Sequence, residues 1–167
     1  MPVTVKGAVE LQKALRKFEP DLAKETRKEI AAVLKPITKE AKGFVIIPAP
    51  LSGWIKRPNS TGRFPQFNAE EVKRGIGYKT TPSKPNRRGF VSLAQINNKT
   101  AAGAIYETAG RITTGGNFVS RLTPLTNSPA GKGRMIYKAY ENNKGEAVKA
   151  VIQAVEKAAD KLNARTR

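Results

Sequence analysis

The chain contains no histidine and no cysteine, and only 13 acidic residues. Without these two residue types it has no disulfide scaffold, no thiolate chemistry, no Ser-His-Asp or Cys-His nucleophile system and almost no way to build a zinc site. The adjacent acids Glu70 and Glu71 point in different directions on a helix or a strand, so they do not converge as an acid–base pair. We therefore expect a binding or structural protein rather than an enzyme, with no catalytic residue, metal or cofactor.

Long hydrophobic runs are also missing. The longest apolar run, Phe44 to Ile47, is far shorter than the roughly 20 residues that a membrane span needs. The first seven residues lack the apolar segment of a signal peptide. The absence of cysteine fits assembly in a reducing cytoplasm. We expect a soluble protein that makes no use of a membrane.

Positive charge is what the chain has in excess. Its 31 Lys and Arg residues face 13 Asp and Glu, for a net charge of +18. Residues 43–100 are the most purely basic part, with ten basic side chains against two acidic ones. Such an excess favours a polyanion or an acidic protein as the partner.

Apolar residues at helical spacing begin and end the chain. Pro20 predicts a break near Glu19, with a second helix starting at Pro20 and stopping at Gly43. Pro36 predicts a kink in this helix, or the end of its regular part near Leu34. The N-terminal apolar stripe consists of Leu11, Leu15, Phe18 and Leu22. At the other end of the chain, the spacing predicts a long helix from about Ile136 to Leu162, with Gly145 as a possible interruption.

Between these helices the pattern indicates a small sheet. Alternation over 76–80 and 90–96 predicts two strands, joined by a basic hairpin connection at 81–89. Residues 101–109 read as a short helix or strand, and 111–134 as a loop. The order predicts one α+β domain over 1–167, with the N-terminal amphipathic helices and the long C-terminal helix packed on a small antiparallel sheet.

Residues 43–73 read as an extended loop or arm rich in Pro and Gly, with aromatic residues spread through it. Loops of this length are uncommon unless they bind something, although the rings could instead pack back onto the core. Basic residues flank the aromatics and also occupy the hairpin connection. They suit phosphate contact or docking onto acidic proteins, and no pattern for reading a base sequence accompanies them. The candidate docking or DNA-facing residues are Lys56, Arg57, Arg63, Lys84, Arg87 and Arg88.

Four short motifs occur in order along the chain: Ala-Pro-Leu-Ser-Gly-Trp at 49–54, Gly-Ile-Gly-Tyr at 75–78, Ala-Ile-Tyr-Glu-Thr-Ala-Gly at 104–110 and Gly-Arg-Met-Ile-Tyr-Lys-Ala at 133–139. With the amphipathic helix before them, they resemble the lambdoid tail-completion, or head-tail joining, proteins of long-tailed bacteriophage necks. The chain departs from that pattern in lacking an extra Thr beside Ser52, in its longer loop at 54–67, and in Glu107 following Tyr106 directly.

The resemblance implies a non-enzymatic virion protein that forms a homo-oligomeric ring, a hexamer, between the connector or stopper and the tail tube. Such a protein is in the host cytoplasm during assembly, and it could contact genomic DNA in the channel. Long loops would make the contacts, with Trp54, Phe64, Phe67, Tyr106 and Glu107 as candidate subunit-interface residues. Two alternatives stay open: a tail terminator that caps the tail tube, and a nonspecific basic DNA-binding protein acting alone.

Overall fold

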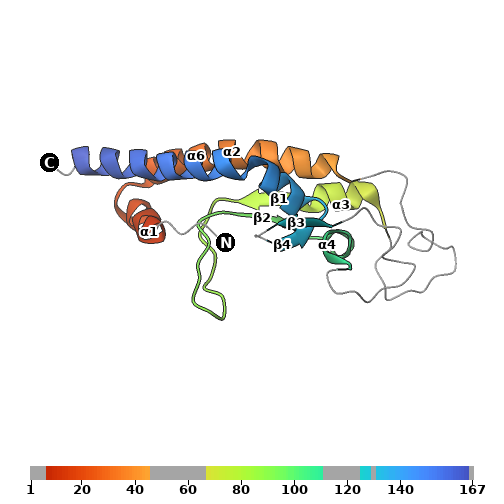
Figure 1. The fold of residues 1–167 in the computed structure, drawn as a ribbon. Coiled ribbons are helices and arrows are strands. Elements are labelled where there is room, and N and C mark those ends of the chain that lie inside the picture. Colours follow the sequence, from red (N-terminus) through yellow and green to blue (C-terminus); the bar gives the residue numbers. More distant parts are fainter. Residues whose placement is uncertain (1–6, 46–66, 111–124, 129–130, 166–167) are drawn as a thin grey trace. The chain divides into compact units, whose positions relative to one another are not determined.

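The structure, a computed structural model, describes residues 7–45, 67–110, 125–128 and 131–165 (Figure 1). Strand β1 pairs with β2, and β3 pairs antiparallel with β4. Helices dominate and the strand pairings are small, so the predicted α+β class is confirmed, together with its N-terminal helices and its long C-terminal helix. In chain order the elements are α1 (Ala8–Phe18), α2 (Pro20–Gly43), α3 (Ala69–Gly75), β1 (Ile76–Lys79), β2 (Gln95–Asn98), α4 (Ala101–Thr108), β3 (Thr126–Ser128), β4 (Gly131–Gly133) and α6 (Ile136–Arg165).

The break between α1 and α2 lies where Pro20 predicts it. Glu19 leaves the helical conformation, with φ −136°, and its N–H donates to the carbonyl of Leu15. Helix α2 then begins at Pro20, where a missing N–H costs no intrahelical bond. The predicted end of its regular part near Leu34 is wrong, because α2 continues through Pro36 to Gly43. Buried residues on both sides of the proline, from Leu34 to Ala41, keep this stretch packed.

Two predicted boundaries in the middle of the chain shift. The second strand, expected over 90–96, is Gln95–Asn98, and the connection between β1 and β2 spans 80–94 rather than 81–89 alone. The last part of the predicted 43–73 loop is helical, because Asn68 caps α3. Its Oδ1 accepts from the backbone N–H groups of Glu70 at 3.0 Å and Glu71 at 3.2 Å.

The predicted loop at 111–134 contains the pair β3 and β4, with Asn127 opposite Lys132. Strands of three residues built from small and polar side chains give no alternating hydrophobic signal, so sequence reasoning missed them. The rest of that segment lies outside the described residues, except Leu125 and Arg134. Helix α6 is continuous through Gly145, without the interruption considered there.

Contacts within the chain group into two compact units. The first comprises 1–36, 78–95 and 143–167, and the second comprises 37–77 and 96–142. Both long helices contribute residues to both units. The single-domain organisation therefore stays a prediction, because the grouping divides continuous helices rather than separating domains at a linker.

The core of the first unit comes from α1, α2 and the C-terminal part of α6. Leu15, Leu22, Ala23 and Ala158 form a buried cluster, and Leu11 and Leu162 pack against it. Three of the four residues of the predicted N-terminal stripe therefore contribute to this cluster. The fourth, Phe18, is 68% exposed, and the Lys17 ammonium lies 5.1 Å from the centre of its ring.

In the second unit, Asn98 packs between Gly75 of α3 and Gly103 of α4. Its Nδ2 donates to the Val72 carbonyl at 2.9 Å, and its Oδ1 accepts from the N–H and the hydroxyl of Thr100. A Cβ atom added to Gly103 would lie 2.1 Å from that Nδ2. Glycine is therefore the residue that allows α4 to approach the end of β2 this closely.

Candidate docking surfaces

The connection between β1 and β2, residues 80–94, is a hairpin that we call the basic arm (Figure 1). Its turn is built by Asn86, whose Oδ1 accepts from the N–H of Arg88 at 2.9 Å and of Phe90 at 3.0 Å. Gly89 supplies the positive φ of +77° that this turn requires. Further back, the Ser83 N–H donates to the Ser92 carbonyl at 2.9 Å, which holds the two sides of the arm together.

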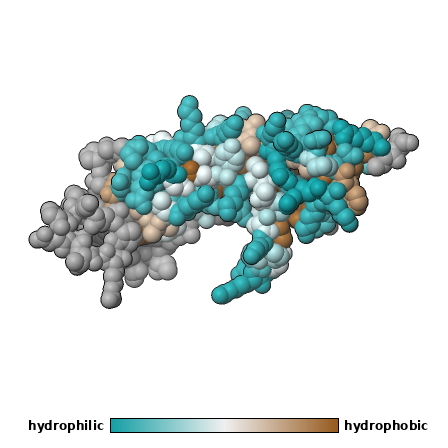
Figure 2. All heavy atoms as spheres, turned by 180° about the vertical axis from the view of Figure 1, so that it is seen from behind, coloured by the Kyte–Doolittle hydropathy of each residue, from teal (hydrophilic) through white to brown (hydrophobic). Residues whose placement is uncertain are grey.

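The tip of the basic arm presents three cations and one ring to solvent. Lys84, Arg87 and Arg88 are all exposed, and Phe90 is 60% exposed. Figure 2 shows this hairpin as an extension with a hydrophilic tip. The structure thus places the three predicted residues on one arm, with Arg87 and Arg88 in its turn and Lys84 shortly before it, and it adds Phe90, which the sequence had placed in a strand.

The other predicted docking residues, Lys56, Arg57 and Arg63, lie outside the described residues, as do Trp54 and Phe64. Of the aromatic residues in the 43–73 segment, Phe44 and Phe67 are described. The Lys138 ammonium lies 4.3 Å from the centre of the Phe44 ring. The second aromatic residue is Phe67. Its ring stacks on that of Tyr106, with centroids 5.8 Å apart and an interplanar angle of 23°. For this residue the ring packs within the second unit.

Tyr106 and Glu107 were predicted at a subunit interface, and the structure buries both inside the second unit. Tyr106 is 0% exposed and Glu107 4%. The Tyr106 hydroxyl donates to the carbonyl of Phe44 at 3.3 Å. Residues of α4 and the start of α6 enclose both side chains, and their place at a subunit interface stays a prediction.

Glu107 holds the start of α6 in an arrangement that we call the Glu107 anchor. Its Oε2 accepts from the N–H groups of Met135 at 2.7 Å and Ile136 at 3.2 Å, and its Oε1 from that of Tyr137 at 2.9 Å. These N–H groups have no partner within the helix, and a carboxylate also favours the positive end of the helix dipole. A Cβ atom on Gly133 would lie 2.2 Å from Oε1, so the carboxylate needs glycine there.

Arg134 adds a further bond to the Glu107 anchor. Its Nη1 donates to the Tyr106 carbonyl at 3.0 Å, and the residue is 4% exposed. Burial lowers the pKa of the Arg134 guanidinium, while Tyr106 and Glu107 act in the opposite direction. With its oxygens bound by backbone N–H groups, the Glu107 carboxylate braces the start of α6.

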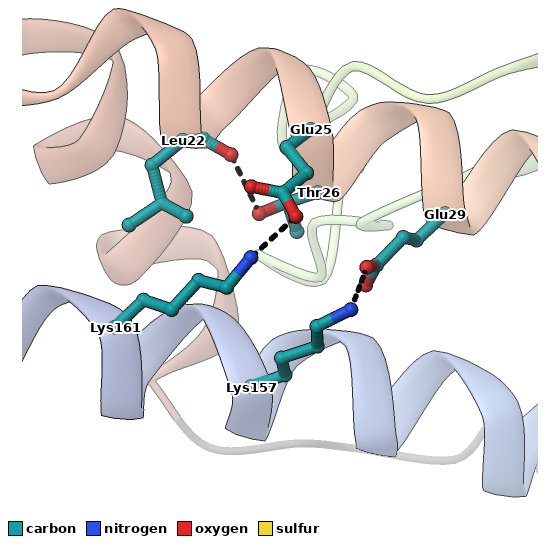
Figure 3. A network of polar contacts seen from close by, with 6 residues as sticks. All are labelled: Leu22, Glu25, Thr26, Glu29, Lys157 and Lys161. Carbon is teal, nitrogen blue, oxygen red and sulfur yellow. Dashed lines mark hydrogen bonds and ion pairs between the residues drawn. The ribbon is translucent and has the colours of Figure 1, made fainter.

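In the first unit, helices α2 and α6 run antiparallel and are joined by a row of ion pairs, which we call the ion-pair ladder (Figure 3). Lys157 Nζ lies 2.5 Å from Glu29 Oε1, and Lys161 pairs with Glu25. Arg165 Nη1 lies 2.5 Å from Glu19 Oε2. Sequence reasoning missed the ladder because its partners are more than 100 residues apart and nothing local links them.

The ladder shifts the proton affinity of two of its members. The hydrogen bond from Lys161 is the main reason that the pKa of the Glu25 carboxyl lies below its ordinary value. The hydrogen bond to Glu29 is the main reason that the pKa of Lys157 lies above its ordinary value. Each shift favours the charged form, as expected for opposite charges in contact.

Within the described part of the chain, no group of three or more His, Cys, Asp or Glu residues gathers that could hold a metal ion. The helices among these residues likewise include none that is long and apolar enough to cross a membrane. The chain matches no protein-family model, no curated protein and no solved structure. Its function must therefore be argued from its own surfaces.

Proposed function

We propose that this chain is a structural protein of the neck of a long-tailed bacteriophage, a tail-completion or head-tail joining component that forms a ring between connector and tail tube. The observation that carries the proposal is the basic arm. Two arginines on one hydrogen-bonded turn, with Lys84 shortly before it and an exposed aromatic ring beside it, suit docking onto an acidic neighbour. A neck ring needs such elements, because each subunit must contact the next subunit and the rings on either side.

The motifs that resemble the neck family also support the proposal. The motif at 104–110 covers the end of α4, and the motif at 133–139 opens α6. These two motifs meet in the Glu107 anchor, where the Glu107 carboxylate binds the N–H groups of Met135, Ile136 and Tyr137. Segments that the resemblance picks out separately thus form one physical brace.

The two long helices are suited to the same role. The ion-pair ladder, together with the apolar cluster around Leu22 and Ala158, holds α2 against α6 in the first unit. A paired-helix support of this kind limits the bending of a subunit that must close a ring at a set rotation.

The test is to deplete this protein during phage assembly and to examine the lysate by electron microscopy. Full heads beside free tails of normal length are expected from a joining protein. Tails of uncontrolled length would instead indicate a tail terminator. Intact virions without the protein would contradict both neck roles.

A complementation experiment then tests the arm itself. Arg87→Glu with Arg88→Glu reverses two charges at its tip and is expected to abolish particle assembly with the fold retained, as seen by circular dichroism. The matched control, Lys13→Glu with Arg16→Glu, reverses two exposed charges on α1 and should leave particle yield within a few-fold of normal. A normal yield from the arm variant would rule out docking through the arm.

A further inference from the structure

Helix α2 carries a row of lysines on its outer side. Its sequence places a lysine at intervals of four, seven, four and three residues, and at about 100° per residue these side chains fall within an arc of about 60°. Four of them are exposed and the last is half-buried. This lysine face consists of Lys24, Lys28, Lys35, Lys39 and Lys42.

The carboxylates of α2 do not neutralise the lysine face. Glu25 and Glu29 are held by Lys161 and Lys157 of α6 in the ion-pair ladder. Glu40 accepts a hydrogen bond from the Asn142 side chain at 2.6 Å. On the helical arc of the lysines the one acid is Asp21, in the first turn. Among the described residues, no ion pair engages any of the five lysines.

An uncompensated row of this kind is not a general property of the helices in this chain. The exposed residues of α6 mix Lys138 and Lys149 with Glu146, Glu156 and Asp160. That mixture is typical of a solvated helix face. Helix α2 instead separates most of its charges: Glu25, Glu29 and Glu40 contact α6, and Asp21 is the one acid on the side of the lysines.

We propose that the lysine face binds the phosphate backbone of double-stranded DNA, without reading its sequence. The row extends over about 27 Å of helix axis, and duplex DNA offers one negative charge for about every 1.7 Å of its own axis. Lysine places a compact charge on a flexible stem, so it can follow a row of phosphates.

The composition of the lysine face distinguishes DNA from an acidic protein. Ala31 and Ala32 are the residues interspersed among the lysines, so the face has no aromatic or large apolar anchor of the kind that protein interfaces depend on. It also has no Arg, Asn or Gln in position to form paired hydrogen bonds with base edges. The lysine face therefore offers positive charge without an anchor residue or a base-reading side chain, which suits contact with the DNA backbone. This inference holds whether or not the chain is a neck protein.

The test uses the full chain and a fluorescent 30-base-pair duplex of arbitrary sequence, titrated at several salt concentrations. The variant replaces Lys24, Lys28, Lys35 and Lys39 by Gln. It is expected to bind on the order of 100-fold more weakly at 0.1 M salt. The slope of log affinity against log salt should fall by about 0.9 for each phosphate that the variant no longer neutralises.

The matched control replaces Lys13, Lys79, Lys99 and Lys149 by Gln. It removes the same charge from exposed positions on other elements and should weaken binding by no more than a few-fold. Equal weakening in the two variants would overturn the proposal, because net charge alone would then explain binding. No binding of the unmodified protein at low salt would overturn it too.

Two further measurements identify the partner and guard against misfolding. Polyglutamate of matched charge should compete poorly with the duplex, and equal competition would contradict a DNA-specific role for this face. Pairwise variants, Lys24→Gln with Lys28→Gln and Lys35→Gln with Lys39→Gln, should each give about half of the decrease in log affinity. If either pair has no effect while circular dichroism shows a retained fold, the continuous lysine face is not the binding site.

Discussion

The two units of this molecule use glutamate in opposite ways. In the second unit, Glu107 is 4% exposed and bonds to three backbone N–H groups at the start of α6. In the first unit, Glu25 and Glu29 lie between α2 and α6, partly exposed to solvent, and each pairs with the end of a long lysine side chain. The same carboxylate is therefore a buried brace in one place and a surface ion pair in the other.

This difference shows that the contribution of a carboxylate to stability depends on how deeply it is buried. A buried carboxylate cannot exchange its partners for water, so its removal leaves N–H groups without partners. A surface ion pair exchanges freely with water and contributes little to stability. The ion-pair ladder has a larger effect on the distribution of charge. It pairs Glu25 and Glu29 with lysines of α6, so the five lysines of the lysine face share their side of α2 with a single acid, Asp21.

The largest expected effect comes from breaking the Glu107 anchor. Glu107→Ala removes three charge-assisted hydrogen bonds from the start of α6 and should lower the free energy of unfolding by about 3 kcal/mol. Glu107→Gln keeps one acceptor oxygen and should lower it less. Urea denaturation followed by circular dichroism measures both changes. A decrease below about 1 kcal/mol for the alanine variant would mean that water replaces the carboxylate.

A smaller effect is expected from a comparison of two glycines, one from each unit. A Cβ atom at Gly103 would lie 2.1 Å from Asn98 Nδ2, so Gly103→Ala should destabilise the protein by about 2 kcal/mol. At Gly145, within α6, a Cβ atom would meet nothing within 4 Å. Gly145→Ala should therefore stabilise by about 1 kcal/mol. Thermal denaturation of the two variants checks the opposite signs, and shifts in the same direction would contradict the packing described for Asn98.

The smallest effect is expected from the pH dependence of the ion-pair ladder. Because the pKa of Glu25 is lowered in the folded protein, its stabilisation is complete above the ordinary carboxyl pKa and is lost as pH falls through the lowered value. Because the pKa of Lys157 is raised, its stabilisation is complete below the ordinary lysine pKa and is lost as pH rises through the raised value.

Two variants separate these contributions. Lys161→Gln should weaken the acid-side dependence of the denaturation midpoint, and Lys157→Gln the alkaline-side dependence. Both effects should shrink in high salt, since the pairs are partly exposed. If both variants instead alter the same side of the pH profile, the assignment of partners in the ladder is wrong.

Much of the fold follows from local signals. The break at Glu19, the start of α2 at Pro20, its stop at Gly43 and the C-terminal helix all follow from proline, glycine and apolar spacing. Short elements without such spacing, namely α3, β3 and β4, escaped prediction. Of the candidate docking residues, Lys84, Arg87 and Arg88 lie exposed on one arm, and its turn could be expected because Asn86 and Gly89 are local turn signals.

Composition alone determined that the chain is strongly basic and lacks the residues of thiol and histidine chemistry, since these properties do not depend on folding. Spacing alone indicated where the long helices lie, because apolar residues three and four positions apart share one face of a helix. Tertiary structure decided the rest: that Tyr106 and Glu107 are buried, that Glu25 and Glu29 face α6, and that the lysines of α2 are left uncompensated. Each of these depends on residues far apart in the chain, and only folding brings such residues into contact.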